Sequence, residues 1–477
     1  MTDPFHAVER LQNASRTMTR RETLLAGTVM LTAGSTWSAD VTGAPSAARR
    51  PNVLFIVADD LAAGDLSCYG RPDYRTPRID SLCAGGVRLT HAYANSCTCS
   101  PSRVALLSGR YQNRLDVGNY DPLPPGRGIG FPSDHPTLAS TLKRAGYVTG
   151  LVGKWHLGDA ATSSPTACGY DEFFGLRGSH VDYFTHAART IPAGETVGDL
   201  YENDTPVRRE GYATRLFTAR AARFISENRR HPFLLSVHYT APHWPWQAPG
   251  DLGTARLNDM HYDGGSRAVF AAMVTELDSG VGSLLTTLRD AGIERDTIVI
   301  FTSDNGGERY SYHWPLRGAK FDLWEGGIRV PCIVRWPGRI AACTTCDQVV
   351  LSMDWLATLA GAAGARMDDG YSPDGIDVMP ALAGERPPVE RTVFWRTQWA
   401  HAVRSGRWKY VATRGHDYLF DLSVDEMERA NLQRREQAVL AELKRAYADW
   451  NDIMKPIPAD ARVPPDLYER FEALEIG

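Results

Sequence analysis

The sequence predicts an α/β protein with a large, mostly parallel sheet sandwiched between helices, followed by a smaller C-terminal antiparallel sheet with one helix. Three observations support this prediction. Continuous apolar runs at residues 53–58 and 297–301 are typical of strands that are buried on both faces. Helical patterns lie between these runs, and such alternation favours parallel pairing. After about residue 383 the pattern changes to short strand-like pieces joined by Gly, Ser and Asp turns.

The larger part contains three clear helical patterns and two further strands. Helices are predicted at residues 137–145, 212–228 and about 268–291, and Gly146 and Gly292 mark the ends of the first and the last. Apolar runs predict strands at 233–237 and 328–334.

The C-terminal part is predicted as four short strands and a helix, at residues 392–395, 401–404, 408–412, 418–422 and 433–450. We therefore divide the chain into a larger domain at residues 51–383 and an α+β subdomain at residues 384–477. Eight cysteines are too few for a disulfide scaffold in a chain of 477 residues.

Residues 1–50 are predicted to be an export signal and linker. The segment around Arg20 and Arg21 resembles a twin-arginine signal, which implies export to the periplasm or the cell exterior. The alternative is a disordered tail that happens to contain an arginine pair. The apolar stretch at 24–33 is too short for a stable membrane span. The net charge of −4, with acids and bases mixed along the chain, gives no reason to expect nucleic-acid binding.

Acidic residues follow two of the predicted strands directly. Asp59 and Asp60 come after residues 53–58, and Asp304 and Asn305 come shortly after residues 297–301. Open α/β sheets bind ligands at the carboxyl ends of their strands, so we expect these side chains to share one site. Their oxygen atoms suit Ca²⁺ or Mg²⁺ and not a thiophilic metal. Each pair alone is also a common turn sequence.

The most informative stretch is residues 99–110, Cys-Ser-Pro-Ser-Arg-Val-Ala-Leu-Leu-Ser-Gly-Arg. It resembles the maturation signature of the formylglycine-dependent sulfatases, which have the alkaline phosphatase-like fold. The resemblance implies that a formylglycine-generating enzyme oxidises Cys99 to an aldehyde, 3-oxoalanine, whose hydrate is the nucleophile. It also implies one divalent cation, usually calcium, held by Asp59, Asp60, Asp304, Asn305 and an oxygen at position 99. A buried structural cysteine at the start of a helix is the alternative.

Further motifs match the charged residues that surround the sulfate in that family. Arg103 lies one helical turn after Cys99. In the segment Gly-Lys-Trp-His, the resemblance implies that Lys154 binds a sulfate oxygen and that His156 bonds the formylglycine hydroxyl. If that segment is extended, both side chains lie on one face. His243, in Ala-Pro-His, resembles the general acid, and Lys320 resembles the second sulfate-binding lysine.

Substrate specificity is less sharply encoded. Residues 178–186, with His180 and Asp182, resemble a segment of the N-acetylgalactosamine-4-sulfatase branch, which implies that these two residues bind a sulfated sugar. Trp244 and Trp246 follow His243 and could stack on a sugar ring or simply pack the loop.

Three functions are therefore considered. The first is hydrolysis of a sulfate monoester on a carbohydrate or an aryl group. The second is a phosphonate monoester or phosphodiester hydrolase of the same superfamily. The third is a glycan-binding protein that is never matured.

Overall fold

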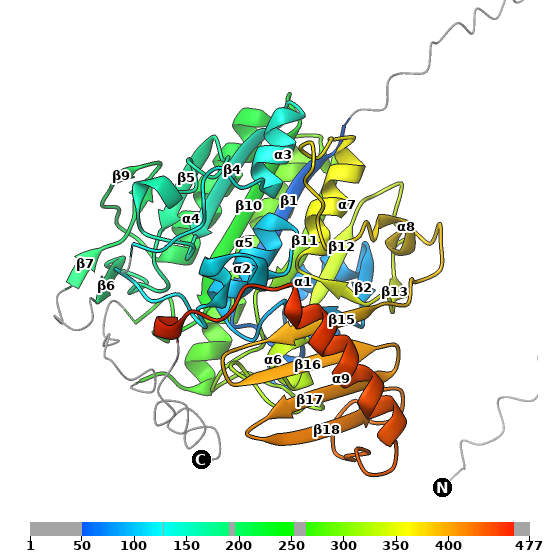
Figure 1. Cartoon of the computed structure of the whole chain (residues 1–477). Coiled ribbons are helices and arrows are strands. Elements are labelled where there is room, and N and C mark those ends of the chain that lie inside the picture. The colour runs from blue at the N-terminus through cyan, green and yellow to red at the C-terminus, as the bar shows by residue number, and fades with distance from the viewer. Residues whose placement is uncertain (1–49, 127, 190–195, 252–263, 462–477) are drawn as a thin grey trace, which may run out of the picture. The chain divides into compact units, whose positions relative to one another are not determined.

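A computed structural model describes residues 50–126, 128–189, 196–251 and 264–461 (Figure 1). Apart from Arg50, the predicted export signal and linker lie outside the described residues. The main sheet has the strand order β13-β2-β12-β11-β1-β10-β4-β5-β8-β9. Its strands are β1 (Asn52–Asp59), β2 (Val87–Leu89), β4 (Val148–Lys154), β5 (Glu172–Leu176), β8 (Tyr201–Glu202), β9 (Thr205–Pro206), β10 (Phe233–Pro242), β11 (Thr297–Ser303), β12 (Cys332–Arg335) and β13 (Thr344–Cys346).

The five central strands, β11, β1, β10, β4 and β5, are all parallel, as the continuous apolar runs predict. Val53 of β1 lies opposite Leu234 on one side and Ile298 on the other. Antiparallel pairs occur only toward the edges of this sheet, between β11, β12 and β2 and between β5, β8 and β9. The prediction of a large, mostly parallel sheet is therefore confirmed.

Helices cover both faces of the sheet (Figure 1). On one face α2 (Cys99–Ser108), α3 (Leu138–Arg144) and α7 (Asp354–Ala363) share a core with Phe55 of β1. On the other face α1 (Pro77–Ala84), α4 (Ala213–Asn228) and α5 (Arg267–Asp290) share a core with Leu54. Successive residues of β1 thus enter opposite layers, as the alternation of side chains along a strand requires.

Helix α5 is the one helix in the described part of the chain that is long and apolar enough to cross a membrane. Half of its apolar window is buried inside the protein, and Met273, Leu277 and Leu284 are fully buried there. Its composition is therefore that of a core helix, which the sequence predicts at the same place.

The strand predicted at residues 328–334 is wrong in its first half. Ile328 ends the short helix α6 (Glu325–Ile328), in which Arg329 N donates to Glu325 O at 2.8 Å, and the strand begins only at Cys332. Pro331 lacks the N–H that a sheet ladder requires, which explains why pairing starts after it. Another short helix, α8 (Met379–Leu382), follows later in the chain.

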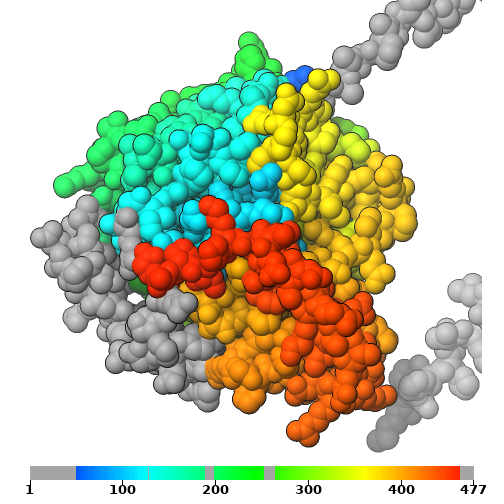
Figure 2. Space-filling view, in the orientation of Figure 1, coloured from blue at the N-terminus to red at the C-terminus, as the bar shows by residue number. Residues whose placement is uncertain are grey.

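The C-terminal sheet has the antiparallel order β15-β16-β17-β18, and α9 packs on it, which confirms the predicted arrangement. Its elements are β15 (Thr392–Arg396), β16 (Ala400–Ser405), β17 (Trp408–Thr413), β18 (His416–Asp421) and α9 (Gln437–Asp452). In the space-filling view these orange and red segments lie directly against the rest of the chain (Figure 2). Trp395 packs there on Tyr93, with ring centroids 5.4 Å apart. The domain boundary at residue 383 stays a prediction.

Two small sheets complete the described fold. β3 (Ala92–Tyr93) pairs with β14 (Val350–Leu351), and β6 (Ala187–Arg189) pairs with β7 (Thr196–Gly198). Figure 1 shows β6 and β7 near the end of the molecule toward which β1 runs.

Candidate active site

The four predicted oxygen donors meet at the carboxyl edge of the parallel strands. Asp59 ends β1, and Asp304 and Asn305 follow β11. Asp60 has a φ of 62°, a left-handed conformation that Asp tolerates better than most residues and that recurs at functional sites. Its N–H donates to Asp304 Oδ1 at 3.3 Å, and Asn305 Nδ2 donates to Asp60 Oδ1 at 2.7 Å. All four side chains are buried.

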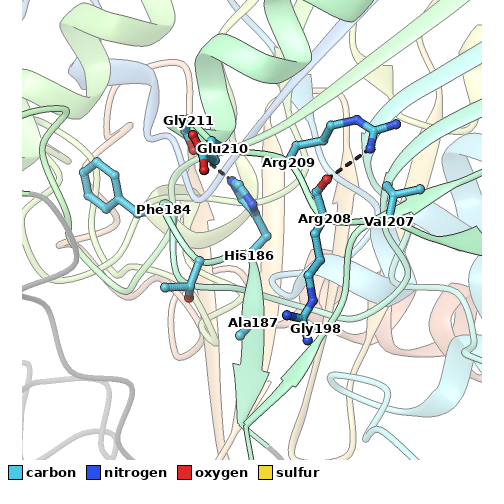
Figure 3. A pocket seen from close by; sticks show the side chains of 10 residues that line it. Phe184, His186, Ala187, Gly198, Val207, Arg208, Arg209, Glu210 and Gly211 are labelled. Carbon is cyan, nitrogen blue, oxygen red and sulfur yellow. Dashed lines mark hydrogen bonds between the residues drawn. The ribbon is translucent and has the colours of Figure 1, made fainter.

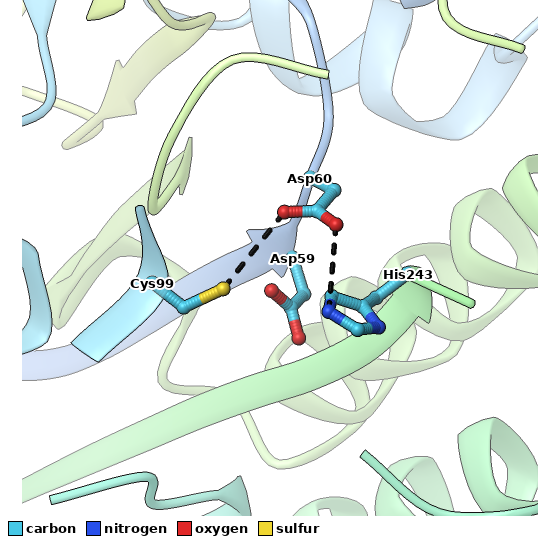
Figure 4. Close-up of side chains that lie close together, drawn as sticks. All are labelled: Asp59, Asp60, Cys99 and His243. Atoms are coloured by element: carbon cyan, nitrogen blue, oxygen red, sulfur yellow. Dashed lines mark hydrogen bonds and ion pairs between the residues drawn. The ribbon is translucent and has the colours of Figure 1, made fainter. Parts of the chain in front are cut away.

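Cys99 is the first residue of α2, and its thiol points at this carboxylate group (Figure 4). Its Sγ lies 3.9 Å from Asp60 Oδ1. One ligand atom from each of Asp59, Asp60, Cys99 and His243 lies within 4.8 Å of the others. His243 is not among the predicted cation ligands, yet its Nε2 lies 3.5 Å from Asp60 Oδ2.

The donor set fits a hard divalent cation. Asp59 Oδ1 and Asn305 Oδ1 are both buried, and neither has a hydrogen-bond partner within the described part of the chain. Buried oxygens of this kind are normally satisfied, so two of them in one acidic cluster are what a site for Ca²⁺ or Mg²⁺ provides.

Three buried cations pair with the three carboxylates, and Arg103 Nη2 lies 3.8 Å from Asp59 Oδ1 in addition to its closer contact with Asp304. Lys154 Nζ lies 2.6 Å from Asp59 Oδ2, and Lys320 Nζ lies 2.7 Å from Asp60 Oδ2. Arg103 donates to Asp304 Oδ2 through Nε at 3.0 Å and through Nη2 at 2.8 Å. The predicted cation ligands and the predicted sulfate-binding residues thus form one network in the folded chain.

Burial and neighbouring charges determine the protonation of Cys99 and Lys320 in this network. Burial raises the pKa of the Cys99 thiol well above its usual value, although Lys154 and Lys320 oppose the shift. Burial alone would lower the pKa of Lys320, but Asp60 and Cys99 raise it well above its usual value. At neutral pH an unmodified Cys99 is therefore a neutral thiol, while Lys320 carries its charge.

His156 lies beside this network, but not in the way the sequence predicts. Strand β4 ends at Lys154, and His156 has a φ of 56°, so the two residues do not share the face of one extended strand. His156 Nε2 lies 3.3 Å from Leu123 O, and its buried Nδ1 has no partner among the described residues. Burial, together with Lys154 and Arg103, lowers its pKa well below the usual value, so the ring is neutral.

His243 follows β10 and faces the same network. Its Nδ1 lies 2.6 Å from Trp244 O, which leaves Nε2 directed toward Asp60. Burial, with Lys320 and Lys154, lowers the pKa of His243 well below the usual value. An anion bound between these cations would raise that pKa again.

The structure separates the two predicted substrate-binding residues of the 178–186 segment. The His180 ring lies 4.0 Å from the Trp244 ring and 6.0 Å from the His243 ring, so it is next to the reactive groups. Asp182 is buried, accepts hydrogen bonds from the N–H groups of Phe184 and Thr185, and also accepts one from Gln247. Asp182 therefore shapes the loop, and this geometry does not support contact with substrate.

The two tryptophans after His243 also differ. Trp244 is half-buried beside His180, which suits contact with a substrate. Trp246 is 4% exposed and packs edge-on against Tyr310, with centroids 4.7 Å apart. The stacking role considered for Trp246 is therefore wrong, because the side chain is in the core.

Sequence reasoning misses one histidine of the site. His238 is buried on β10, and its Nδ1 lies 3.3 Å from both Arg103 Nη1 and Lys154 O. It pairs in register with Gly153, where a Cβ would lie 1.9 Å from His238 O, so only glycine allows this approach. Burial and then Arg103 lower its pKa well below the usual value. The available signal was a polar residue inside an otherwise apolar central strand.

Comparison with known proteins agrees with this site. A family model described as Sulfatase matches residues 51–365. Arylsulfatase A of Bos taurus is 34% identical over 442 residues, which cover 81% of this chain and 84% of that protein. N-acetylgalactosamine-6-sulfatase of Canis lupus familiaris is 34% identical over 390 residues, which cover 77% and 72%. The crystal structure of Ps i-CgsB in complex with k-i-k-neocarrahexaose has a TM-score of 0.79 at 28% identity and covers 89% of this chain and 98% of that one.

The fold and these matches show that the chain belongs to the sulfatase family, within the alkaline phosphatase-like superfamily. It is a sulfuric ester hydrolase, the class to which its arylsulfatase and N-acetylgalactosamine-6-sulfatase relatives belong.

Proposed function

We propose that this enzyme hydrolyses a sulfate monoester on a carbohydrate or an aryl group, with Cys99 matured to formylglycine and with Ca²⁺, or alternatively Mg²⁺, as cofactor. One observation carries this proposal: Cys99 opens a helix directly against the cluster of Asp59, Asp60 and His243. A neutral buried thiol is a poor nucleophile, whereas a formylglycine hydrate at the same position supplies an attacking hydroxyl beside a cation that polarises the sulfate.

Asp59, Asp60, Asp304 and Asn305 would hold the cation together with an oxygen at position 99. Lys154 and Lys320 would then turn part of their charge toward the sulfate oxygens, and Arg103 would neutralise the position of the nucleophile. Preorganised cations lower the energy of a transition state in which negative charge builds up on the leaving ester oxygen. The formylglycine-generating enzyme is the partner that this maturation requires.

The two histidines have separate roles in this proposal. His156 would bond the formylglycine hydroxyl through its unpartnered Nδ1, because its Nε2 already lies near Leu123 O. His243 would protonate the leaving oxygen through Nε2, because its Nδ1 is engaged by Trp244 O. Bound sulfate ester is an anion, which favours the protonated form of His243 that a general acid requires.

The two alternatives make different demands on the same site. A phosphonate monoester or phosphodiester hydrolase would use the same nucleophile on phosphorus. An unmatured glycan-binding protein would keep the thiol, yet it would have no use for three buried cations paired with three carboxylates around it. The names of the relatives favour sulfur over phosphorus.

Peptide mass spectrometry across Cys99 tests the first step. The protein is made in a host with a formylglycine-generating enzyme, and a known sulfatase is matured in the same cells as a control. We expect an aldehyde at position 99, and we expect Cys99→Ala to fold normally but to lose turnover by more than about 1000-fold. A thiol at Cys99 beside a matured control would favour the glycan-binding alternative.

Parallel kinetics on an aryl sulfate and an aryl phosphodiester with the same leaving group test the reaction class. We expect the sulfate to have the higher kcat/KM. Dominant turnover of the diester would overturn the sulfatase proposal in favour of the phosphorus hydrolase.

Export by the twin-arginine route is part of the proposal. Cell fractionation of the wild type and of a variant with Arg20→Lys and Arg21→Lys checks it. We expect only the wild type outside the cytoplasm, and equal export of both would contradict this route.

A further inference from the structure

A second hollow lies beside the β6–β7 hairpin and contains none of the residues of the reaction centre. Its volume is about 650 Å³, within the range of about 300–1,000 Å³ that ligand sites occupy. It is lined by Phe184, Thr185, His186, Ala187, Gly198, Val207, Arg208, Arg209, Glu210 and Gly211. Figure 3 shows Phe184 and the two arginines on opposite sides, with His186 between them.

The lining contains two arginines and one carboxylate. Arg208 is exposed, and its guanidinium has no carboxylate partner in the part of the chain that the structure describes. Arg209 pairs with Glu202 at 2.9 Å, and Glu210 is the one carboxylate of the lining. His186 is neutral, because burial lowers its pKa while its Nε2 lies 3.0 Å from Gly211 O. A guanidinium with no carboxylate partner among the described residues, across the hollow from a half-buried phenyl ring, suits a sugar that carries an anionic group.

The loop that borders the reaction centre also forms the wall of this hollow. Tyr183 OH donates to His243 O at 3.0 Å, and the next residue, Phe184, lines the hollow. Asp182 N donates to Ala187 O at 3.0 Å, which folds the loop back on itself. The four chain steps from His180 to Phe184 span at most about 14 Å even when fully extended. A chain of a few sugars can bridge that distance.

We propose that this hollow is an accessory subsite, in which Arg208 binds a sulfate group on a sugar several units away from the ester that is hydrolysed. The proposal rests on the proposed function and narrows its substrate to a sulfated oligosaccharide. Guanidinium groups bind sulfate through paired hydrogen bonds, which gives direction as well as charge. A solved relative in complex with a hexaose supports a substrate of this length.

Kinetics with substrates of different length test the subsite. Arg208→Ala is compared with Arg230→Ala, an exposed arginine that precedes the amino end of β10, whereas the reaction centre lies at its carboxyl end. The probes are nitrocatechol sulfate and size-fractionated disaccharides and hexasaccharides of chondroitin sulfate and of carrageenan. We expect Arg208→Ala to raise the KM for the preferred hexasaccharide about fivefold, and less at high salt, without changing kcat/KM for the aryl sulfate. Arg230→Ala should change neither.

A second variant blocks the hollow without touching its charge. A Cβ at Gly198 would meet no atom within 4 Å, so Gly198→Trp can be accommodated and its ring would occupy space that the sugar needs. We expect the same selective rise in the KM for the hexasaccharide. Unchanged hexasaccharide kinetics in both variants, or equal losses on the aryl sulfate, would overturn the proposal.

Calorimetric titration of the Cys99→Ala protein with the same hexasaccharides separates this proposal from the proposed function. If no sulfate ester is hydrolysed but hexasaccharide binding still depends on Arg208, the proposed reaction is refuted and the proposed subsite is supported. If aryl sulfate is hydrolysed but none of the hexasaccharides binds in an Arg208-dependent way, the reaction stands and the subsite is refuted.

Discussion

Two buried clusters of opposite charges in the described part of the chain differ in how closely cations approach their oxygen atoms. The first is the reaction-centre cluster of Asp59, Asp60, Asp304, Asn305, Arg103, Lys154 and Lys320. The second, the sheet-junction cluster, consists of Lys409, Glu325, Glu428, Tyr93 and Arg404, and joins the C-terminal sheet to the rest of the chain. Its Lys409 Nζ lies 2.8 Å from Glu325 Oε1 and 2.8 Å from Glu428 Oε1.

In the sheet-junction cluster the carboxylates of Glu325 and Glu428 share Lys409 as a partner. Tyr93 OH donates to Glu325 Oε2 at 2.8 Å, and Arg404 bonds the same tyrosine. Burial of Glu325 is outweighed by Lys409 and the neighbouring arginines, which lower its pKa to about 2, whereas burial raises the pKa of Glu428 to about 7. Lys409 and its neighbours thus keep Glu325 ionised, whereas burial favours the protonated form of Glu428. Among the described residues, Glu428 Oε1, Asp59 Oδ1 and Asn305 Oδ1 all lack a hydrogen bond. Glu428 Oε1 nevertheless lies 2.8 Å from Lys409 Nζ, whereas Asp59 Oδ1 is 3.8 Å from Arg103 Nη2. Buried oxygens that no cation approaches closely, more than burial or charge alone, therefore distinguish the candidate metal site from the structural cluster.

Removal of divalent cations should produce the largest difference between the clusters. We expect chelation to reduce turnover of the matured enzyme at least about 100-fold and to lower its Tm, because ligand binding to the folded state stabilises it. Added Ca²⁺ should restore both quantities. Assays after dialysis against a chelator, with metal content checked by elemental analysis, measure the effect. Full activity in protein shown to be metal-free would refute the cation's role.

A matched pair of lysine substitutions should separate the clusters next most strongly. We expect Lys154→Met to lower kcat/KM about 100- to 1000-fold, because it removes a preorganised charge from the reaction centre. Lys409→Met should instead lower the free energy of unfolding by about 3–5 kcal/mol, because it leaves a buried carboxylate unpaired.

Thermal unfolding and kinetics on both lysine variants, with active sites counted by formylglycine content, check this pair. If Lys409→Met lowered kcat/KM of the folded fraction as much as Lys154→Met does, the sheet-junction cluster would not be purely structural and the distinction between the two clusters would be wrong.

His243→Ala should have a smaller effect that depends on the leaving group. A general acid contributes about 100-fold or more when the leaving oxygen is basic, and much less for nitrophenolate-like groups, which leave without protonation. Measurement of kcat/KM over a series of aryl sulfates gives the slope against leaving-group pKa, and we expect a steeper slope in the variant. Equal losses across the series would reject the assignment.

Asp121 should show the smallest effect, a pH dependence of stability. This buried carboxyl accepts hydrogen bonds from Thr98 and Ser96, just before Cys99, and burial raises its pKa to about 7. Its contribution to stability is therefore fully present below its ordinary pKa and is lost as the pH rises toward 7. Between pH 5 and 7 that loss is about 2 kcal/mol.

Asp121→Asn should remove this dependence, so that the variant gains in Tm relative to the wild type as the pH rises from 5 to 8. Thermal unfolding over that range measures the gain, with the exposed Asp134→Asn as control. A Tm difference that stays constant with pH would count against the raised pKa.

The elements with a strong periodic pattern were predictable from the sequence. Strands β1 and β11, helix α5 and the C-terminal sheet all lie where the apolar pattern places them. The short strands β6 to β9 were not predicted, because segments of two or three residues are set by the chain that surrounds them and not by their own pattern.

The residues of the candidate site were likewise predictable only in part. Cys99, Arg103, Lys154 and Lys320 were predicted because each matches a position in a sulfatase motif. His238 was missed because its partners, Lys154 of β4 and Arg103 of α2, come from distant parts of the chain and meet it only in the folded protein. The hollow beside β6 was missed for the same reason, since residues 184–187 and 207–211 meet only in the folded protein.

The pairing of charges in the reaction-centre cluster also bears on product release. Its three carboxylates are matched in number by three cationic side chains, so the proposed divalent ion would add two positive charges to this set. The ester that binds carries one negative charge, whereas the inorganic sulfate that leaves carries two. On the proposed function, the end product would match the charge of the metal-loaded site better than the substrate does, and we expect free sulfate to inhibit the enzyme.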